Sequence, residues 1–311
     1  MTEDKSHAAR QRRYRARLEM VEAARLLPEF RAWLQFRHRA EQTRKHYGWR
    51  VQRLARLLGA NGVSLQKATT ADLVAVWPSV GPSYHNGLLE ALRAFYKFAQ
   101  EKGYVRVGMN PALGLEKVRK PKRLPRPYGE QERTRYLSAA LALGPRYYAT
   151  ACLGVYAGLR VAEVAALPWA AVGDRLRVVG KGNKERVVPV AKPLKEALEA
   201  WRSVCPSTRW LFPPLETARG GPNNGSKPVH ACRVWVWHRE VLKRAGLYTG
   251  EHGRDGFHRL RHKAVTAVYR SSGRDLLTTA RFAGHASVGT TAVYALVEDD
   301  DVEQAVKGMY G

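Results

Sequence analysis

The sequence predicts a mainly α-helical protein with one small β-sheet, divided into an N-terminal helical domain and a larger C-terminal α+β domain. Three observations support this prediction. Apolar residues recur every three or four positions along most of the chain, which is the period of an amphipathic helix. Only two short segments alternate apolar and polar residues as strands do. A proline-rich basic stretch interrupts the helical pattern near residue 120, and 311 residues is a usual length for two domains.

The first 115 residues are expected to hold a basic extension and a small helical domain. Residues 1–27 are polar and rich in arginine, and the helical pattern begins at residue 28. Thr70 is expected to cap a short helix, and Gly59 and Gly103 follow apolar runs as helix ends do. The helices expected within residues 28–115 lie around 30–36, around 47–58, from 71 onward and around 83–102.

A basic linker of residues 116–127 is expected between the two domains. Its prolines prevent a helix and favour an extended chain. The basic residues in this segment indicate either a solvated tether or a segment that lies along an anionic duplex. They are Arg119, Lys120, Lys122, Arg123 and Arg126, interleaved with Pro121, Pro125 and Pro127.

The C-terminal domain, residues 128–311, mixes both element types. Residues 175–179 and 185–190 alternate as strands, and the turn 180–184 should join them as a hairpin. Residues 298–311 form a tail whose apolar residues keep a roughly helical spacing. Helices are expected around 130–143, 145–157, 193–204, 230–245, 259–272, 274–283, 288–296 and 300–309.

The charge balance indicates the class of partner. The chain has 53 lysines and arginines against 27 acidic residues, a formal charge of +26, which favours a polyanion such as nucleic acid. A generally adhesive basic protein, for example one bound to ribosomes, is the alternative. No apolar run is long enough to span a bilayer, so we expect no membrane partner. Three scattered cysteines argue against a disulfide framework and are typical of a reducing cytosol.

Three stretches carry candidate chemistry. In residues 157–163, a glycine turn opens a helix at Arg160. The first turn of a helix is a favourable place for a phosphate. The alternative is that Arg160 simply pairs with the glutamate three residues later. The hairpin tip 180–186 presents Lys181 at a turn, where basic residues also serve solubility alone. In residues 258–262, which read His-Arg-Leu-Arg-His, a histidine and an arginine three positions apart could hold one anion.

Metal-dependent chemistry is not indicated by the sequence. His258 and His262 have the spacing of half a zinc site, but no third ligand accompanies them. The acidic run 299–301 is most simply the start of a helix. We therefore expect neither a metal nor a cofactor, and a basic protein that cuts phosphodiesters without a metal needs a nucleophile of its own.

Taken together and in order, these stretches resemble the tyrosine recombinases, the phage-integrase and Xer-type family of site-specific DNA recombinases. The resemblance covers residues 128–297 through motifs, and residues 28–115 more loosely as the family's helical, SAM-like core-binding domain. The matching motifs are Gly158 to Glu163 for the first arginine, Gly180 to Arg186 for the lysine hairpin, His258 to Arg261 for the His-x-x-Arg box, Gly284-His285 for the second histidine and Tyr294 for the nucleophile.

The resemblance implies a role for each matched residue. Tyr294 would attack the scissile phosphate and form a 3′-phosphotyrosyl link, for which its pKa, ordinarily near 10, requires activation by the surroundings. Glu163 would steady one of the basic side chains, or simply form an ion pair. The other implied catalytic residues are Arg160 and Arg261 on the non-bridging oxygens, Lys181 as proton donor to the leaving 5′-oxygen, His258 as acceptor of the tyrosine's proton and His285 as a group that orients the phosphate.

The resemblance also implies partners. The chain would act on double-stranded DNA carrying a specific recombination site, as a homotetramer that passes through a Holliday junction, and would be a monomer or weak oligomer when free. Accessory DNA-bending proteins are possible partners. The location would be the cytoplasm of a prokaryotic cell, with the chain encoded by the cell or by its phage or plasmid, and the role would be integration, excision or dimer resolution. A type IB topoisomerase-like enzyme and a catalytically silent DNA-binding regulator are the alternatives. The expected DNA contacts are Arg44, Lys45, Arg119, Lys120, Lys122, Arg123, Arg126, Lys184 and Arg186.

Overall fold

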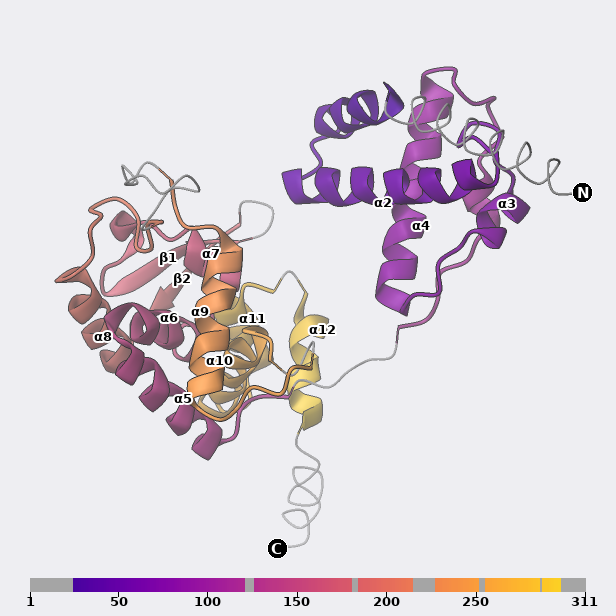
Figure 1. Ribbon diagram of the computed structural model, residues 1–311. Coiled ribbons are helices and arrows are strands. Elements are labelled where there is room, and N and C mark those ends of the chain that lie inside the picture. Colours follow the sequence, from indigo (N-terminus) through magenta and orange to yellow (C-terminus); the bar gives the residue numbers. More distant parts are fainter. Residues whose placement is uncertain are drawn as a thin grey trace, which may run out of the picture. The chain divides into compact units, whose positions relative to one another are not determined.

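The computed structural model describes residues 25–120, 126–180, 184–214, 227–251, 255–285 and 287–297. The chain separates into two compact units, residues 1–122 and residues 123–311 (Figure 1). Several expectations lie outside the described residues. They concern most of the basic extension, Lys122, Arg123, Lys181 and the tail 298–311.

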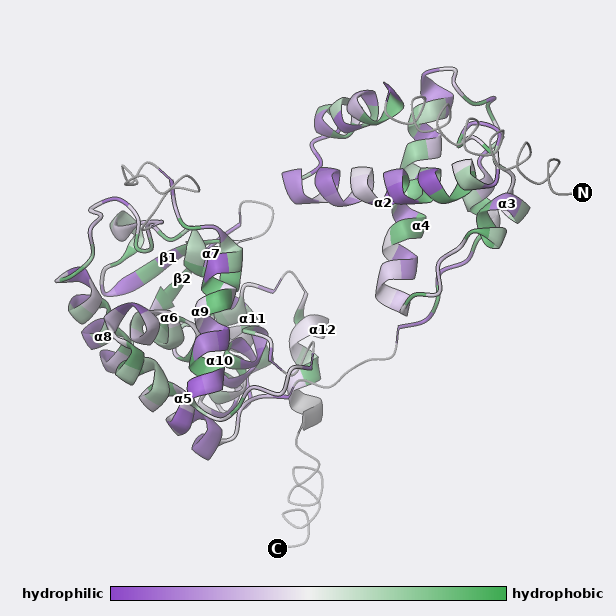
Figure 2. Cartoon of the chain, viewed as in Figure 1, coloured by the Kyte–Doolittle hydropathy of each residue, from purple (hydrophilic) through white to green (hydrophobic). Residues whose placement is uncertain are grey.

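The N-terminal unit is helical in its described part. Its elements are a helix at 25–36, α2 (Glu41–Ala60), α3 (Thr70–Ala75), α4 (Pro82–Glu101) and the short 3₁₀ helix η1 (Pro111–Gly114). Hydrophobic and hydrophilic residues are interspersed along α2 and α4 (Figure 2), because each helix buries one side and exposes the other. The core includes Phe30, whose ring meets the edge of Phe95 with centroids 5.4 Å apart.

The cap of α3 is one residue earlier than the sequence indicates. Thr69 is the N-cap, because its hydroxyl accepts from the backbone N–H of Asp72 at 3.2 Å while the Asp72 carboxylate accepts from the Thr69 N–H at 2.8 Å. The hydroxyl of Thr70 donates instead to the carbonyl of Pro111 at 3.0 Å. The prediction that Thr70 caps this helix is therefore wrong: adjacent threonines offered two choices, and only one could pair with Asp72.

The first part of the expected linker lies along α4. The side chain of Asn86 both donates to the carbonyl of Val118 and accepts from its N–H, each at 2.9 Å. Lys117 pairs with Glu90 at 2.9 Å. The side-chain amide of Asn86 thus pairs with both polar groups of Val118, as a neighbouring strand would, so the chain is held on α4 as far as residue 118.

The C-terminal unit is built around α6 (Pro145–Val155), whose residues from Ala149 to Val155 are all buried. It packs against α5 (Glu130–Leu143), α8 (Lys192–Arg202), α9 (Ala231–Arg244) and α10 (His258–Ser271). Gly154 permits the contact with α10, because a Cβ there would come within 2.8 Å of Leu260 Cδ1. The small residues of α6 thus bring α10 close to the turn that follows α6.

The single sheet of the described residues is the expected hairpin. Strands β1 (Arg175–Val179) and β2 (Glu185–Pro189) pair antiparallel, with Arg177 opposite Val187. Alternate residues face the core, which confirms the period-two pattern seen in the sequence.

The remaining elements of this unit follow the expected order, with one difference. They are α7 (Val161–Ala165), η2 (Trp169–Ala171), α11 (Leu276–Ala283), α12 (Val288–Thr291) and η3 (Ala292–Val297). The sequence predicts one helix over 288–296, whereas the structure has a single α-turn followed by tighter 3₁₀ winding, which contacts α10. In the described parts of the chain, no helix is long and apolar enough to cross a membrane.

Candidate active site

A glycine turn at the end of α6 places Arg160. Gly158 has φ +60, and a Cβ there would lie 3.2 Å from the ring of Phe282, so a larger residue would be both strained and crowded. Arg160 follows as the N-cap of α7. Its backbone N–H donates to Glu163 Oε2 at 2.8 Å and its Nη1 to Oε1 at 2.7 Å. The carboxylate therefore fixes both the backbone and the guanidinium of this arginine.

A second arginine binds the same carboxylate. Arg186, on β2, donates to both oxygens of Glu163 at 2.9 and 2.8 Å, and its side chain is only 7% exposed. Burial alone would raise the pKa of Glu163, but hydrogen bonds from Arg186 and from the backbone of Arg160 lower it to about 2. The carboxylate is thus ionised and shared between two guanidiniums.

This geometry does not support the expected DNA contact of Arg186. Its guanidinium lies in the interior, and its Cδ would be 2.8 Å from a Cβ at position 284. The absence of a side chain at Gly284 therefore leaves room for Arg186 next to the turn that carries His285. The alternating strand pattern predicts this burial, since residue 186 shares the inward face of β2 with Val188.

The third guanidinium belongs to α10. Arg261 is 4% exposed and donates to the carbonyl of Gly158 at 2.5 Å and to the carbonyl of Ala283. Burial, and then the positive charges of Arg160 and Arg186, lower its pKa to about 10. The arginine thus connects the turn after α6 to the end of α11.

Two imidazoles lie near these cations. His258 reaches solvent, and partial desolvation together with the charges of Arg261 and Arg160 lowers its pKa. His285 follows the left-handed Gly284 that ends α11, and its Nδ1 lies 2.9 Å from Thr291 Oγ1. Desolvation, followed by the charge of Arg261, lowers the pKa of His285 to about 4. Both shifts favour the neutral form of the imidazole.

Tyr294 lies beside this group, on η3. Its side chain is 4% exposed and packs with Val265 and Ala283. The phenol oxygen lies 2.7 Å from Nδ1 of His262, and the ring stacks on His285 with centroids 6.3 Å apart and planes 19° from parallel. Burial raises the pKa of Tyr294, and the charges of Arg261 and Arg160 partly oppose this effect.

Five of the six expected catalytic residues are therefore brought together from four separate segments. They are Arg160, His258, Arg261, His285 and Tyr294. Counted over the described residues, three guanidiniums against the one carboxylate of Glu163 leave two positive charges beside a buried phenol. Such a cluster favours an anion. No group of three or more histidine, cysteine or acidic side chains in the described residues could hold a metal ion.

His262 is a member of this cluster that the sequence analysis missed. The sequence offered it only as half of a zinc site with His258. The available signal is its position, since it directly follows Arg261 and lies one turn after His258 on α10. Without the placement of η3, nothing in the sequence pairs it with Tyr294.

The other expected DNA contacts that the structure describes are exposed, except Arg44, which is half-buried. Lys45 pairs with Glu41 at 2.6 Å, Lys120 donates to Ser83 at 3.3 Å, and Lys184 is exposed at the start of β2. The remaining ones that the structure describes are Arg44, which donates to Gln35, Arg119, which is exposed, and Arg126, whose carbonyl accepts from Arg259.

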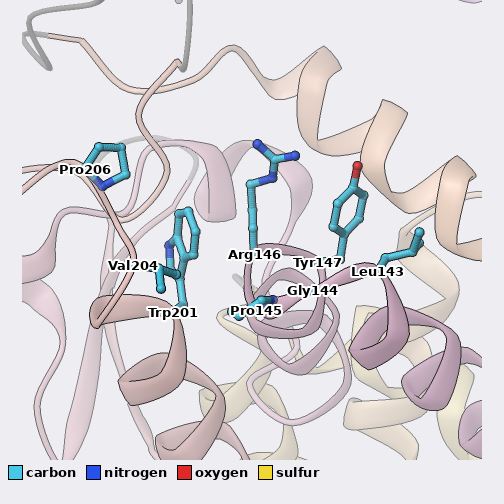
Figure 3. A pocket seen from close by; sticks show the side chains of 8 residues that line it. All are labelled: Leu143, Gly144, Pro145, Arg146, Tyr147, Trp201, Val204 and Pro206. Atoms are coloured by element: carbon cyan, nitrogen blue, oxygen red, sulfur yellow. The ribbon is translucent and has the colours of Figure 1, made fainter.

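A surface cavity of about 310 Å³ lies apart from this cluster, at the beginning of α6 (Figure 3). Among the residues that line it, Arg146 lies between Tyr147 and Trp201 in this view. The guanidinium of Arg146 lies 4.7 Å from the ring centroid of Trp237. The convergent side chains described above lie beyond the other end of α6, so the cavity is separate from them.

Comparisons with known proteins agree with the motif order. The model of the phage integrase family matches residues 130–300, more than half of the chain. Tyrosine recombinase XerC of Haemophilus influenzae is 31% identical over 215 residues, which is 66% of this chain and 68% of the relative. XerC of Alcanivorax borkumensis is 30% identical over 230 residues, 72% of each chain.

Solved structures share the fold at lower identity. A XerH site-specific recombinase bound to a palindromic difH substrate superposes with a TM-score of 0.65 at 18% identity, over 86% of this chain and 80% of that one. A λ integrase dimer bound to a COC′ core site gives 0.63 at 18% identity, over 86% and 75%. Together with the family match and the XerC relatives, this establishes that the chain belongs to the phage integrase family and is a site-specific recombinase of the tyrosine type.

Proposed function

We propose that the chain cleaves and rejoins strands of double-stranded DNA at a specific site, with Tyr294 as the nucleophile that forms a 3′-phosphotyrosyl link. One observation carries this proposal: the phenol lies in the same cluster as the guanidiniums of Arg160 and Arg261, beside His285. A phosphorus held by the two arginines would lie next to a hydroxyl positioned to attack it.

The arginines would stabilise the charge that builds on the pentacoordinate phosphorus. Arg261 is oriented by two backbone carbonyls, and Arg160 by both oxygens of Glu163. Donors held in advance lose little energy to reorganisation when charge develops. The proton of Tyr294 passes to an imidazole of α10, for which His258 and His262 are the two candidates, and His285 helps to orient the phosphate.

Lys181 would donate the proton that the departing 5′-oxygen needs. The residue itself lies outside the described part of the chain, but its neighbour Gly180 is close to the cluster. A Cβ at Gly180 would lie 3.5 Å from Glu163 Oε1, and its N–H donates to the carbonyl of Lys184 at 2.8 Å. The base of the hairpin therefore adjoins the carboxylate that orients Arg160, which supports a role for the next residue in the same reaction.

The remaining partners follow from the reaction and from the relatives. A λ integrase with the same fold, at TM-score 0.61 and 18% identity, forms a tetramer bound to a Holliday junction. We infer a homotetramer on two duplexes for this chain, with strand exchange through such a junction, accessory DNA-bending proteins and a cytoplasmic location. The exposed cations of the N-terminal unit would bind the DNA backbone as a core-binding domain. The outcome would be integration and excision, or resolution of dimers.

A capture experiment tests the proposal. Sheared genomic DNA from the organism that encodes the chain is incubated with the protein and denatured with SDS, and DNA that remains attached is sequenced. We expect one defined sequence joined through its 3′-phosphate to Tyr294, with Tyr294→Phe abolishing the attachment and the exposed control Tyr248→Phe retaining it. Absence of any adduct would indicate a silent DNA-binding protein. Adducts at unrelated sequences, with relaxation of any supercoiled plasmid, would indicate a topoisomerase.

A further inference from the structure

The closest polar partner of the nucleophile in the described residues is an imidazole outside the expected catalytic set. Nδ1 of His262 lies 2.7 Å from the phenol oxygen of Tyr294, and the two ring centroids are 5.6 Å apart with planes at 49°. This distance and tilt direct a nitrogen of the imidazole, rather than its face, at the oxygen. A phenol in such a contact donates its proton along the bond that a proton transfer would follow.

The other two imidazoles are less suited to take this proton. His285 stacks on the phenol ring, so the lone pair in its ring plane does not point at the phenol oxygen, and its Nδ1 already contacts Thr291. His258 lies one turn before His262 on α10 and reaches solvent, and no hydrogen bond to Tyr294 is present for it among the described groups. Only His262 meets the geometric requirement for a base.

We propose that His262 accepts the proton of Tyr294 during strand cleavage, and this inference rests on the proposed function. In that step the proton moves from the phenol oxygen to Nδ1 while the oxygen forms its bond to phosphorus. The bond from phosphorus to the 5′-oxygen breaks, and the leaving oxygen takes a proton from Lys181. On rejoining, the 5′-hydroxyl returns its proton to Lys181 as its oxygen bonds to phosphorus. The bond from phosphorus to the Tyr294 oxygen then breaks, and that oxygen takes back the proton from His262.

The surroundings keep His262 in the form that this step requires. Burial lowers its pKa to about 4, together with the positive charge of Arg261 and the charge that His258 carries when protonated, both on the same helix. The charged and titratable groups that face it from other elements are Tyr294 on η3 and His285 after α11. The lowered pKa favours the neutral ring at pH 7, and the proposed step uses the tautomer that carries its proton on Nε2 and accepts at Nδ1. A bound phosphate would raise this pKa, which brings the base closer to the operating pH.

The test uses the full-length protein and a nicked duplex that carries the sequence recovered by the capture experiment. His262→Asn places an amide oxygen near the position of Nδ1, so the phenol keeps a hydrogen-bond acceptor but loses its base. We expect the single-turnover cleavage rate to fall by roughly 10²- to 10⁴-fold with unchanged thermal stability. The variant is then made with 3,5-difluorotyrosine at position 294, whose phenol is more acidic and needs less help from a base.

The fluorinated nucleophile separates a base from a structural residue. We expect it to restore most of the cleavage rate of His262→Asn and to leave the defect of Lys181→Ala unchanged, since that variant lacks the acid. The inference is overturned if His262→Asn cleaves at the wild-type rate, or if its defect persists with difluorotyrosine. Failure of the wild-type protein to form any adduct would instead overturn the proposed function, so the two failures are distinguishable.

Discussion

Arginines at the surface of the N-terminal unit differ from those in the interior of the C-terminal unit. In the N-terminal unit, Arg53 is exposed and Arg50 is half-buried, and the guanidinium of each lies 5.6 Å from the ring centroid of Tyr84. In the C-terminal unit, Arg186 and Arg261 are buried and are held by a carboxylate or by carbonyls. An exposed cation is screened by salt and moves freely, whereas a buried one keeps its position and its field.

This contrast shows which part of the net charge of +26 serves chemistry. Cations on the surface raise the affinity for a polyanion without selecting one phosphate. Buried cations that exceed their acidic partners can stabilise charge at one point. The composition gives only the total number of surface and buried cations. Substitutions of single residues separate the two kinds of cation, and the largest effect is expected for the buried ones.

The largest effect is expected at Arg261. Arg261→Ala should lower the cleavage rate at saturating protein by ~10²–10³, because a preoriented donor to the transition state is lost. Arg53→Ala, the exposed counterpart, should leave that rate within about twofold. Arg261→Lys keeps the charge but cannot span the carbonyls of Gly158 and Ala283, so it should rescue little. Equal rates for Arg261→Ala and Arg53→Ala would erase the distinction between the units.

Removal of Arg186 should mainly affect stability. Arg186→Met leaves Glu163 with only one of its two cations and should lower the free energy of unfolding by about 3 kcal/mol, measured in urea. Arg177, on the outward face of the paired strand β1, provides the matched control, and Arg177→Met should change stability by less than about 0.5 kcal/mol. Similar losses of unfolding free energy for both variants would mean that the buried ion pair stabilises the fold no more than an exposed arginine does.

The pH dependence of stability should report the same ion pair. Glu163 has a pKa of about 2 in the folded chain against an ordinary value of 4.5, so its contribution is complete above pH 4.5 and is lost as the pH falls towards 2. That difference corresponds to about 3 kcal/mol as an upper estimate. Glu163→Gln should flatten the fall in unfolding free energy over this window, whereas Glu196→Gln, on the exposed face of α8, should not.

The smallest effect is expected at the exposed cluster. Arg53→Ala removes a cation that lies over Tyr84 and, at 5.8 Å, over the exposed ring of Trp49. We expect a change in unfolding free energy of at most about 1 kcal/mol. If this surface contacts DNA, the slope of log affinity against log salt should fall by about one unit, measured by titration at several salt concentrations. An unchanged slope would remove this surface from the DNA interface.

Local patterns in the sequence predict most of the fold. Apolar spacing gives the long helices, and strict alternation gives the hairpin, because each element buries one face. The end of the chain is less predictable: the 3₁₀ winding of η3 depends on its packing against α10, which no local pattern encodes. The choice between Thr69 and Thr70 as a cap depended on which hydroxyl reaches Asp72 and which reaches Pro111.

The site shows the same limit. The order of the motifs predicts that Arg160, Arg261 and Tyr294 belong to the site, because the order and spacing of the motifs can be seen in the sequence itself. The burial of Arg186 could have been read from its place on the inward face of β2, but a basic residue near a hairpin tip suggested DNA instead. The contact of His262 with Tyr294 joins residues 32 positions apart, so it required the tertiary structure.

The central claim is that the clustered guanidiniums of Arg160 and Arg261 and the phenol of Tyr294 act on one phosphate. A crystal structure of the protein with orthovanadate and a DNA duplex that lacks the scissile phosphate tests it most directly, since vanadate adopts the geometry of the transition state. We predict Tyr294 Oη at an apical position of the vanadium, with Arg160 and Arg261 both within hydrogen-bond distance of its equatorial oxygens. Arginines bound to two different phosphates, or a phenol remote from the vanadium, would contradict the account.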